Sequence, residues 1–166
     1  MVWRSLKKHV RSQDSALGLA AEDIIVCSTG VIGQELSIKP FEYGVPKLAE
    51  KVSCDGGQEA AEAIMTTDTI PKSIAVEFEI DGEDLSYRRD SQGQRMIDPN
   101  MATMLSFITT DAAVSPEMLD KALKADVKTS YNQICVDGDM STNDTVAVLA
   151  NGMAGNDEIT ESRHRV

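Results

Sequence analysis

The sequence predicts an α+β fold in which helices and a β-sheet form a layered α/β sandwich. Apolar and polar residues alternate through residues 73–80, as they do in a strand with one packed face. After Ser115, apolar residues recur at helical spacing instead. Strand-like and helix-like stretches also interleave along the chain, whose 166 residues suit one domain.

The first part of the chain predicts three helices, one strand and one glycine turn. Leucine and valine at helical spacing indicate a helix over residues 5–17, and the β-branched run 24–27 predicts a buried strand. The glycines of residues 28–33 permit a tight turn with exposed backbone amides. Further helices are expected over residues 40–52 and 59–65.

The middle of the chain predicts a β-hairpin followed by a third strand. The alternating strand 73–80 ends at Asp81-Gly82, a dipeptide that favours a hairpin turn, and residues 84–88 form the returning strand. The polar stretch 89–95 has no periodicity, which indicates a loop. Residues 104–108 return to the composition of a strand.

The last part of the chain begins with the strongest helix signal in the sequence. Ser115 can cap a helix whose first turn contains Pro116 and Glu117. A strand is expected over residues 132–136, and a final helix from about residue 143 to Gly152. The polar residues 155–166 are expected to fray.

Composition excludes several functional classes. A formal net charge of −11 and a pI near 4.5 argue against binding to nucleic acid or an anionic membrane. No apolar run approaches the roughly 20 residues that span a bilayer. Three scattered cysteines and two histidines near opposite ends predict reduced thiols, no metal site and a cytoplasmic location. The basic first thirteen residues weakly suggest a transit peptide, with a solvated helix face as the alternative.

Several common functional motifs are excluded because residues that they require are missing. Asp137-Gly-Asp139 begins like a calcium loop, but the glycine and glutamate that an EF-hand needs are missing. Residues 28–33 lack the Lys-Ser/Thr of a phosphate-binding loop, and two terminal histidines cannot build a Ser-His-Asp triad. An N-terminal threonine that uses its own α-amine as base needs neither histidine nor metal. Composition alone does not select which threonine this would be.

Four segments resemble, in the same order, the motifs of the ornithine acetyltransferase (glutamate N-acetyltransferase) family. They are Ser28-Thr-Gly-Val-Ile-Gly33, Glu62-Ala-Ile-Met-Thr-Thr-Asp-Thr69, residues 97–112 with Ala-Thr-Met-Leu at their centre, and Val136-Asp-Gly-Asp-Met-Ser-Thr-Asn-Asp-Thr145. The resemblance extends from about residue 17 to residue 159. It implies a sandwich of the kind that this family shares with self-processing aminopeptidases, incomplete in this chain.

The resemblance also implies roles for individual residues. The precursor would cut itself between Ala102 and Thr103, and the freed Thr103 would carry the acetyl group as nucleophile. Thr29 and Gly30 match the pair that stabilises the oxyanion, and Thr66 matches a substrate-binding threonine. The single partial domain would then divide into residues 1–102 and 103–166, the end of an α-chain and the start of a β-chain.

One motif departs from the family. A substrate-binding lysine of the family corresponds here to Gln92, and a nearby glycine corresponds to Arg95. Gln92 keeps the capacity for hydrogen bonding but loses the positive charge, so weaker substrate binding is expected. Family members also extend beyond both ends of this chain, and further substrate contacts are expected beyond Val166.

The resemblance therefore predicts an acetyltransferase of arginine biosynthesis that moves an acetyl group from N-acetylornithine to glutamate. No cofactor is expected, although acetyl-CoA is a possible co-substrate for a second, amino-acid N-acetyltransferase activity. The two chains of the cut precursor are expected to assemble as a homo-oligomer. Two alternatives stay open: a truncated, non-catalytic remnant of such an enzyme, and a related aminopeptidase with an N-terminal nucleophile.

Overall fold

The computed structural model describes residues 18–93, 104–141 and 143–162. The chain divides into two compact units, residues 1–60 and 61–166, and each is described by itself. The helix predicted over residues 5–17 lies outside the described residues.

The first unit contains helices and irregular backbone. A 3₁₀ turn, η1, spans Ala21–Asp23, and helix α2 spans Lys39–Lys51, close to the prediction. The strand predicted at residues 24–27 is wrong: no strand forms there, and Ile25 is 56% exposed. A strand exists only where a neighbour accepts its hydrogen bonds, and none of the described residues pairs with this segment. Helix α3 spans Gly57–Ala63, at the boundary between the units.

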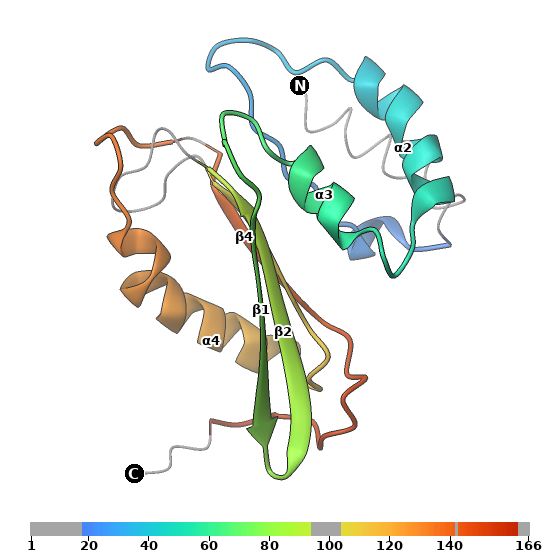
Figure 1. Ribbon diagram of the computed structural model, residues 1–166, viewed down its shortest axis with the longest axis vertical. Helices are drawn as coiled ribbons and strands as arrows, with labels where there is room; N and C mark the ends of the chain where they lie inside the picture. Colours follow the sequence, from blue (N-terminus) through green and yellow to red (C-terminus); the bar gives the residue numbers. More distant parts are fainter. Residues whose placement is uncertain (1–17, 94–103, 142, 163–166) are drawn as a thin grey trace. The chain divides into compact units, whose positions relative to one another are not determined.

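The second unit is built on a four-stranded mixed sheet (Figure 1). Its strands, in both chain and spatial order, are β1 (Lys72–Ile80), β2 (Glu83–Gln92), β3 (Leu105–Thr110) and β4 (Thr145–Ala150). The pairs β1–β2 and β2–β3 are antiparallel, whereas β3 and β4 are parallel. The sheet and its helices agree with the predicted α+β class.

The β1–β2 hairpin forms as predicted, with a turn at Asp81 and Gly82. Both residues have positive φ, 54° and 90°, which is the backbone of a type I′ turn. Glycine adopts this conformation without steric cost, and aspartate tolerates it better than most residues.

Strand β2 continues to Gln92, so the loop predicted from residue 89 is wrong up to that point. Residues 87–91 pair with β1 on one side and with β3 on the other. The polar side chains are matched locally, because Asp90 accepts hydrogen bonds from Arg88 and Ser73. Hydrogen bonding to a strand on each side therefore stabilises β2 here, although its apolar and polar residues do not alternate.

Strand β4 replaces the predicted final helix. Residues 105–110 of β3 pair in parallel with residues 145–150, in register from Leu105 with Thr145 to Thr110 with Ala150. Val146 and Val148 fit either periodicity in so short a run, but their β-branched side chains favour a strand once a partner is present.

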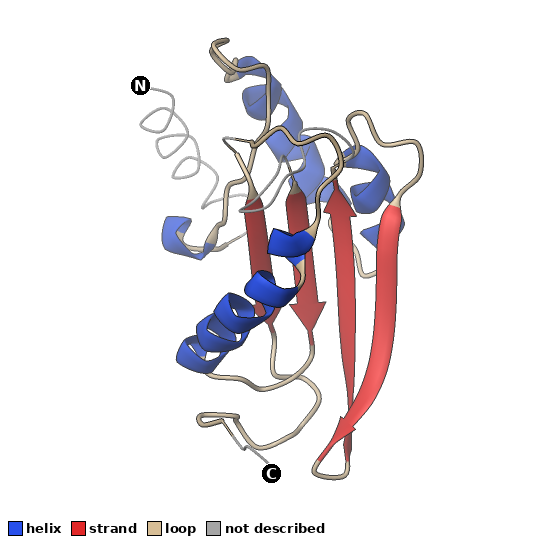
Figure 2. Cartoon of the chain, turned by 90° about the vertical axis from the view of Figure 1, so that its left-hand side faces the viewer, coloured by secondary structure: helices blue, strands red, loops and turns tan. Residues whose placement is uncertain are grey.

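Helix α4 (Pro116–Thr129) lies across one face of the sheet (Figure 2). Its predicted start is confirmed, since the Ser115 hydroxyl accepts the Met118 amide at 3.3 Å. A 3₁₀ turn, η2 (Tyr131–Gln133), follows, and the strand predicted at residues 132–136 does not form. No strand of the described residues pairs with this apolar run, and Ile134 and Val136 are 44% and 59% exposed.

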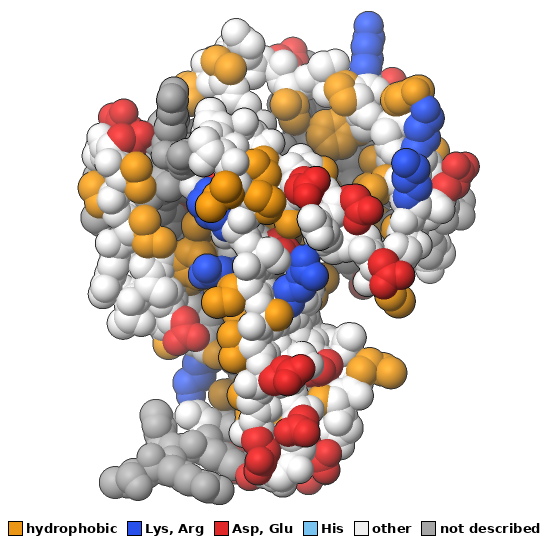
Figure 3. Space-filling model, viewed as in Figure 1, with side chains coloured by type: hydrophobic (Ala, Val, Ile, Leu, Met, Phe, Trp, Pro, Cys, Tyr) orange, Lys and Arg blue, Asp and Glu red, His pale blue; other side chains and the backbone are white. Residues whose placement is uncertain are grey.

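The apolar side chains of β1 are less buried than its alternation predicts. Ile74, Val76 and Phe78 are 48%, 46% and 38% exposed, because β1 is an edge strand of the sheet. Acidic side chains gather at the hairpin end of β1 and β2 (Figure 3).

The segment after β4 is held in place up to Ile159, contrary to the predicted fraying. The Ile159 amide donates to Ala113, and the Ser115 amide donates to Ile159, both at 3.0 Å. Asn156 accepts the Ala113 amide at 2.9 Å. Within the described ranges, no helix combines the length and the apolar character needed to cross a bilayer.

Candidate functional site

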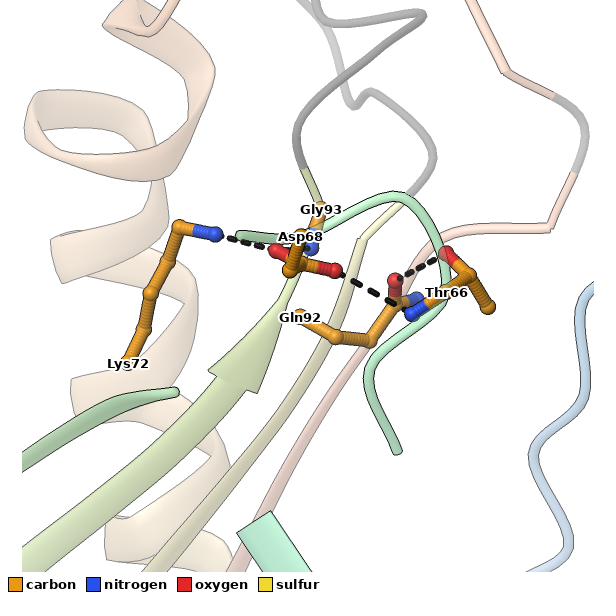
Figure 4. Close-up of polar contacts among 5 residues, drawn as sticks. All are labelled: Thr66, Asp68, Lys72, Gln92 and Gly93. Carbon is orange, nitrogen blue, oxygen red and sulfur yellow. Dashed lines mark hydrogen bonds and ion pairs between the residues drawn. The ribbon is translucent and has the colours of Figure 1, made fainter. Parts of the chain in front are cut away.

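A polar cluster occupies one end of the sheet, where β1 begins and β2 ends (Figure 4). Asp68 lies at its centre, in the loop between α3 and β1. Its Oδ1 atom accepts the Gly93 amide at 3.0 Å and pairs with the Lys72 ammonium, while Oδ2 accepts the Thr66 amide at 3.4 Å. One carboxylate thus joins the loop to the ends of both strands.

Asp68 remains ionised in this setting. Burial alone would raise the pKa of Asp68, and its side chain is fully buried. Hydrogen bonds from the Lys72 ammonium and from the Gly93 and Thr66 amides outweigh this effect, so the pKa lies below its ordinary value. The buried negative charge is therefore stabilised by three donors rather than left isolated.

The cluster brings together two residues that the sequence assigns to substrate binding. The Thr66 hydroxyl donates to Oε1 of Gln92 at 3.4 Å, although the residues are 26 positions apart. Gln92 is only 1% exposed, whereas Thr66 is exposed. The pair therefore connects the sheet interior to solvent.

The Nε2 atom of Gln92 is buried and has no hydrogen-bond partner within the part of the chain that the structure describes. An unsatisfied buried donor costs about 1–3 kcal/mol. A carbonyl or carboxylate oxygen that reached this donor would satisfy it and remove that cost.

A second polar contact lies at the start of β3, immediately after the predicted nucleophile. The Met104 amide donates to Oδ1 of Asp144 at 2.8 Å, and the Thr145 amide donates to the Met104 carbonyl at 2.9 Å. Burial raises the pKa of Asp144, while hydrogen bonds from the Met104 amide and the Ser141 hydroxyl oppose the rise.

The structure does not place the remaining predicted residues relative to this cluster. Ala102, Thr103 and Arg95 lie outside the described residues. Thr29 and Gly30 belong to the other compact unit, where Thr29 is half-buried and Gly30 is exposed. The predicted sharing of one site by Thr29, Gly30 and Thr103 stays a prediction.

The glycine turn itself is present in the first unit. The Gln34 amide donates to the Val31 carbonyl at 3.1 Å, and Gly33 has a φ of 83°. A residue with a Cβ would be strained at this φ, so glycine is required there. In the three described stretches of the chain, no group of three or more His, Cys, Asp and Glu side chains is arranged to hold a metal ion.

Sequence reasoning missed the two aspartates that organise these contacts. Asp68 and Asp144 both lie inside motifs that carry the family resemblance, but neither motif shows which backbone amide its carboxylate will accept. The amides of Gly93 and Met104 lie 25 and 40 positions away, and only folding brings them to the carboxylates.

These motifs extend across nearly the whole chain, and a sequence model of the ArgJ family matches residues 3–165. The chain belongs to the ArgJ family. The matched range includes the Thr66 and Gln92 pair, the Met104 contact and the Ala102–Thr103 bond.

Three ArgJ relatives illustrate the similarity. The chain is 48% identical over 158 residues to the arginine biosynthesis bifunctional protein ArgJ of Caldanaerobacter subterraneus subsp. tengcongensis, covering 95% of this chain and 39% of the relative. The protein of that name from Symbiobacterium thermophilum is 49% identical over 156 residues, with 94% and 39% covered. The mitochondrial ArgJ protein of Dictyostelium discoideum is 47% identical over 151 residues, with 91% and 34% covered. The chain thus spans less than two fifths of each ArgJ relative.

The Asp68 contacts predict a large effect on stability. Asp68→Ala leaves the Gly93 and Thr66 amides and the Lys72 ammonium without their acceptor, so we expect the free energy of unfolding to fall by about 2–3 kcal/mol. Urea denaturation measures this. Asp120→Ala is the matched control, because its ion pair with Lys124 is largely exposed and should contribute under about 0.5 kcal/mol.

The same carboxylate predicts a pH dependence. Because folding lowers the pKa of Asp68, its contribution to stability is present above the unfolded value of about 3.9 and is lost as the pH falls through the folded value. The stability of Asp68→Asn should therefore vary less than that of wild type below about pH 4. Parallel curves for the two proteins would contradict this assignment.

Proposed function

We propose that this chain forms part of an acetyltransferase of arginine biosynthesis that moves an acetyl group from N-acetylornithine to glutamate. The observation that carries the proposal is the hydrogen bond from the Thr66 hydroxyl to Oε1 of Gln92, at 3.4 Å. Thr66 matches a substrate-binding threonine of the family, and Gln92 stands at the position of its substrate-binding lysine. Membership of the ArgJ family over residues 3–165 supports the same reaction.

Self-cleavage would come first. The Thr103 hydroxyl attacks the Ala102 carbonyl carbon, the C–N bond between the two residues breaks, and an ester to Thr103 replaces it. Water then hydrolyses the ester, which leaves a carboxylate on Ala102 and a free α-amine and hydroxyl on Thr103. An α-amine has a pKa of about 7.7–8.0, so it is partly unprotonated near neutral pH and can accept the hydroxyl proton.

Acetyl transfer would follow in two half-reactions at one site. The Thr103 hydroxyl attacks the acetyl carbonyl of N-acetylornithine and releases ornithine, to which the α-amine returns the proton. The amine of glutamate then attacks the acetyl ester and restores the hydroxyl. The Thr29 hydroxyl and the Gly30 amide would donate to the oxyanion in both steps.

Thr66 and Gln92 would bind the substrate. The exposed Thr66 hydroxyl can reach a ligand from the solvent side, and the unpartnered Nε2 of Gln92 can donate to it from the interior. Both proposed substrates carry a carboxylate, which can accept a hydrogen from Nε2 of Gln92. The Thr66 hydroxyl donates its hydrogen to Gln92, so its oxygen would accept an N–H of the substrate. Asp68 would hold Thr66 in place by accepting its amide, and it would hold Gly93, the residue after Gln92, in the same way.

The test uses the protein as the cell makes it. Intact-mass measurement should find two fragments that meet between Ala102 and Thr103, and labelled acetyl should pass from N-acetylornithine to glutamate. A cut protein that hydrolyses peptides without transferring acetyl would instead be an aminopeptidase. An uncut protein without transfer would be a non-catalytic relative. Supplying labelled acetyl-CoA in place of N-acetylornithine tests the second donor.

We expect the substitution Gln92→Lys to raise the affinity for substrate. A charged donor contributes about 1 kcal/mol more than a neutral one, so Gln92→Lys should lower KM for glutamate roughly fivefold. Steady-state kinetics measure this, and Gln92→Leu, which has no donor, should raise KM. A raised KM in Gln92→Lys would show that the buried position does not accept an ammonium group.

A further inference from the structure

A cavity of about 560 Å³ lies between α4 and the face of the sheet that α4 crosses (Figure 2). All of its lining residues belong to the second compact unit. Arg89, Ile108 and Val148, aligned across β2, β3 and β4, line it on the sheet side. Leu119 and Leu123 of α4 line it opposite. Packed interiors leave few voids larger than a water molecule, whereas ligand pockets measure about 300–1,000 Å³. This space is therefore as large as a ligand site.

The two ends of the cavity differ in polarity. Toward the β1–β2 turn the lining is mainly apolar and includes Phe78 and Ile80. Near the C-terminal end of α4 it includes Tyr131, whose hydroxyl lies 2.9 Å from that of the fully buried Ser106. The Arg89 guanidinium lies 6.0 Å from the centre of the Tyr131 ring. A ligand with one apolar end and one polar end would match this division.

Arg89 has no acidic partner within the described part of the chain. Its Nε atom is buried and makes no hydrogen bond there, and no carboxylate forms an ion pair with its guanidinium. Arg88, on the opposite face of β2, instead donates from Nε and Nη2 to Asp90. A charged group at the wall of an apolar cavity is normally paired, because an unpaired one loses hydration without compensation. Arg89 therefore presents an available charged donor to the cavity.

We propose that this cavity binds a small monocarboxylic acid with an apolar body, whose carboxylate pairs with the Arg89 guanidinium. Guanidinium and carboxylate groups match in two parallel N–H···O bonds, and such charge-assisted bonds are roughly twice as strong as neutral ones. The apolar body would lie between the sheet and α4, against Ile108 and Leu123, and would be removed from water. Thr66 and Gln92 do not line this cavity, so the inference does not depend on the proposed function.

Asp126 limits the charge that the ligand can carry. Its exposed side chain lines the cavity on the α4 side. Burial chiefly raises the pKa of Tyr87, and the charges of Arg89 and Asp126 both act on this tyrosine, so the two charged groups lie near the same part of the cavity. A second carboxylate on the ligand would be repelled by Asp126. A monocarboxylate is therefore preferred to a dicarboxylate of the same length.

Isothermal titration calorimetry of the full chain tests the inference with sodium octanoate, disodium suberate and 1-octanol, which have the same number of carbon atoms. We expect octanoate to bind at one site per chain and at least about tenfold more tightly than the other two, because only octanoate combines a single carboxylate with an apolar end. Arg89→Gln should weaken octanoate binding about tenfold and leave 1-octanol binding unchanged. Arg88→Gln is the matched control, because it removes an arginine from the opposite face of the same strand.

NMR locates the bound octanoate. Nuclear Overhauser effects should join its protons to the methyl groups of Leu119 and Leu123, which line the cavity. None should join them to Leu48 of α2, an exposed leucine of the other compact unit. Overhauser effects to Leu48 alone would show binding to exposed apolar surface and would overturn the inference.

Three further results would overturn it. Wild type could bind no octanoate, or bind it no more tightly than 1-octanol. Arg88→Gln could weaken octanoate binding as much as a folded Arg89→Gln, which would indicate a general effect of charge. Two copies of the chain could associate on size-exclusion chromatography and bind no octanoate, which would identify this face as an interface between copies. Should Arg89→Gln not fold, as judged by thermal unfolding, the comparison of octanoate with 1-octanol on wild type still decides.

Discussion

Thr103→Ala should remain a single uncut chain, whereas wild type should separate into two fragments that meet between Ala102 and Thr103. The reason is chemical: alanine has no hydroxyl to attack the Ala102 carbonyl, and without cleavage no α-amine is freed to act as base. Acetyl transfer should fall to the background rate for the same reason. Intact mass and a labelled-acetyl assay measure the two losses separately.

One control for Thr103 keeps a hydroxyl at that position, and the other removes the hydroxyl of a different threonine. Thr103→Ser should still cut, because serine presents the same nucleophile. Thr109→Ala removes the hydroxyl of an exposed threonine in β3, six positions along the chain, and should cut like wild type. Cleavage of Thr103→Ala at the same bond would remove Thr103 as the nucleophile.

Thr29→Val should lower kcat by about 100- to 1000-fold. Valine has nearly the shape of threonine but no hydroxyl, so it would remove one proposed donor to the oxyanion while the proposed Gly30 amide remains. The loss of one such donor typically costs roughly 2.7–4 kcal/mol of barrier. Because the charge on the oxyanion develops in the transition state, KM should change far less than kcat.

The conservative variant of Thr29 tests whether the hydroxyl or the fold is responsible. Thr29→Ser keeps the donor and should retain most of kcat, while thermal unfolding should show that Thr29→Val remains folded. Equal kcat in Thr29→Val and wild type would contradict a role at the oxyanion. A loss confined to KM would move Thr29 from the oxyanion to substrate binding.

The elements predicted correctly carry their signals in neighbouring residues. The β1–β2 hairpin follows from alternation and from a dipeptide suited to positive φ, and the turn at Asp81 and Gly82 has that backbone. Helix α4 follows from the Ser115 cap and Pro116, and Ser115 does accept the Met118 amide. In both cases the deciding interaction lies within a few residues of the signal.

The elements predicted wrongly depend on distant partners. The run Thr145–Ala150 was expected to form a helix, but it pairs in parallel with β3, a partner about 40 positions earlier. Residues 24–27 and 134–136 have the composition of strands and form none, because the described chain provides no strand to pair with them. Such short apolar runs satisfy helix, strand and loop patterns alike.

The candidate site divides in the same way. Thr66 and Gln92 were identified from motifs, and folding places the Thr66 hydroxyl 3.4 Å from Oε1 of Gln92. Asp68 and Asp144 were missed as anchors, since a carboxylate accepts whichever amide the fold brings to it. The pairing of Thr103 with Thr29 and Gly30 stays a prediction from the resemblance.

The sequence by itself therefore determined the family, the α+β class, the hairpin and helix α4, and it predicts the residues assigned to chemistry. These conclusions rest on side-chain identity and on local backbone preference, which can be read along the chain. Only the tertiary structure decided the parallel pairing of β4 with β3 and the amides held by Asp68 and Asp144. Hydrogen bonds between distant segments depend on which partner is close in space, and spacing along the chain does not specify it.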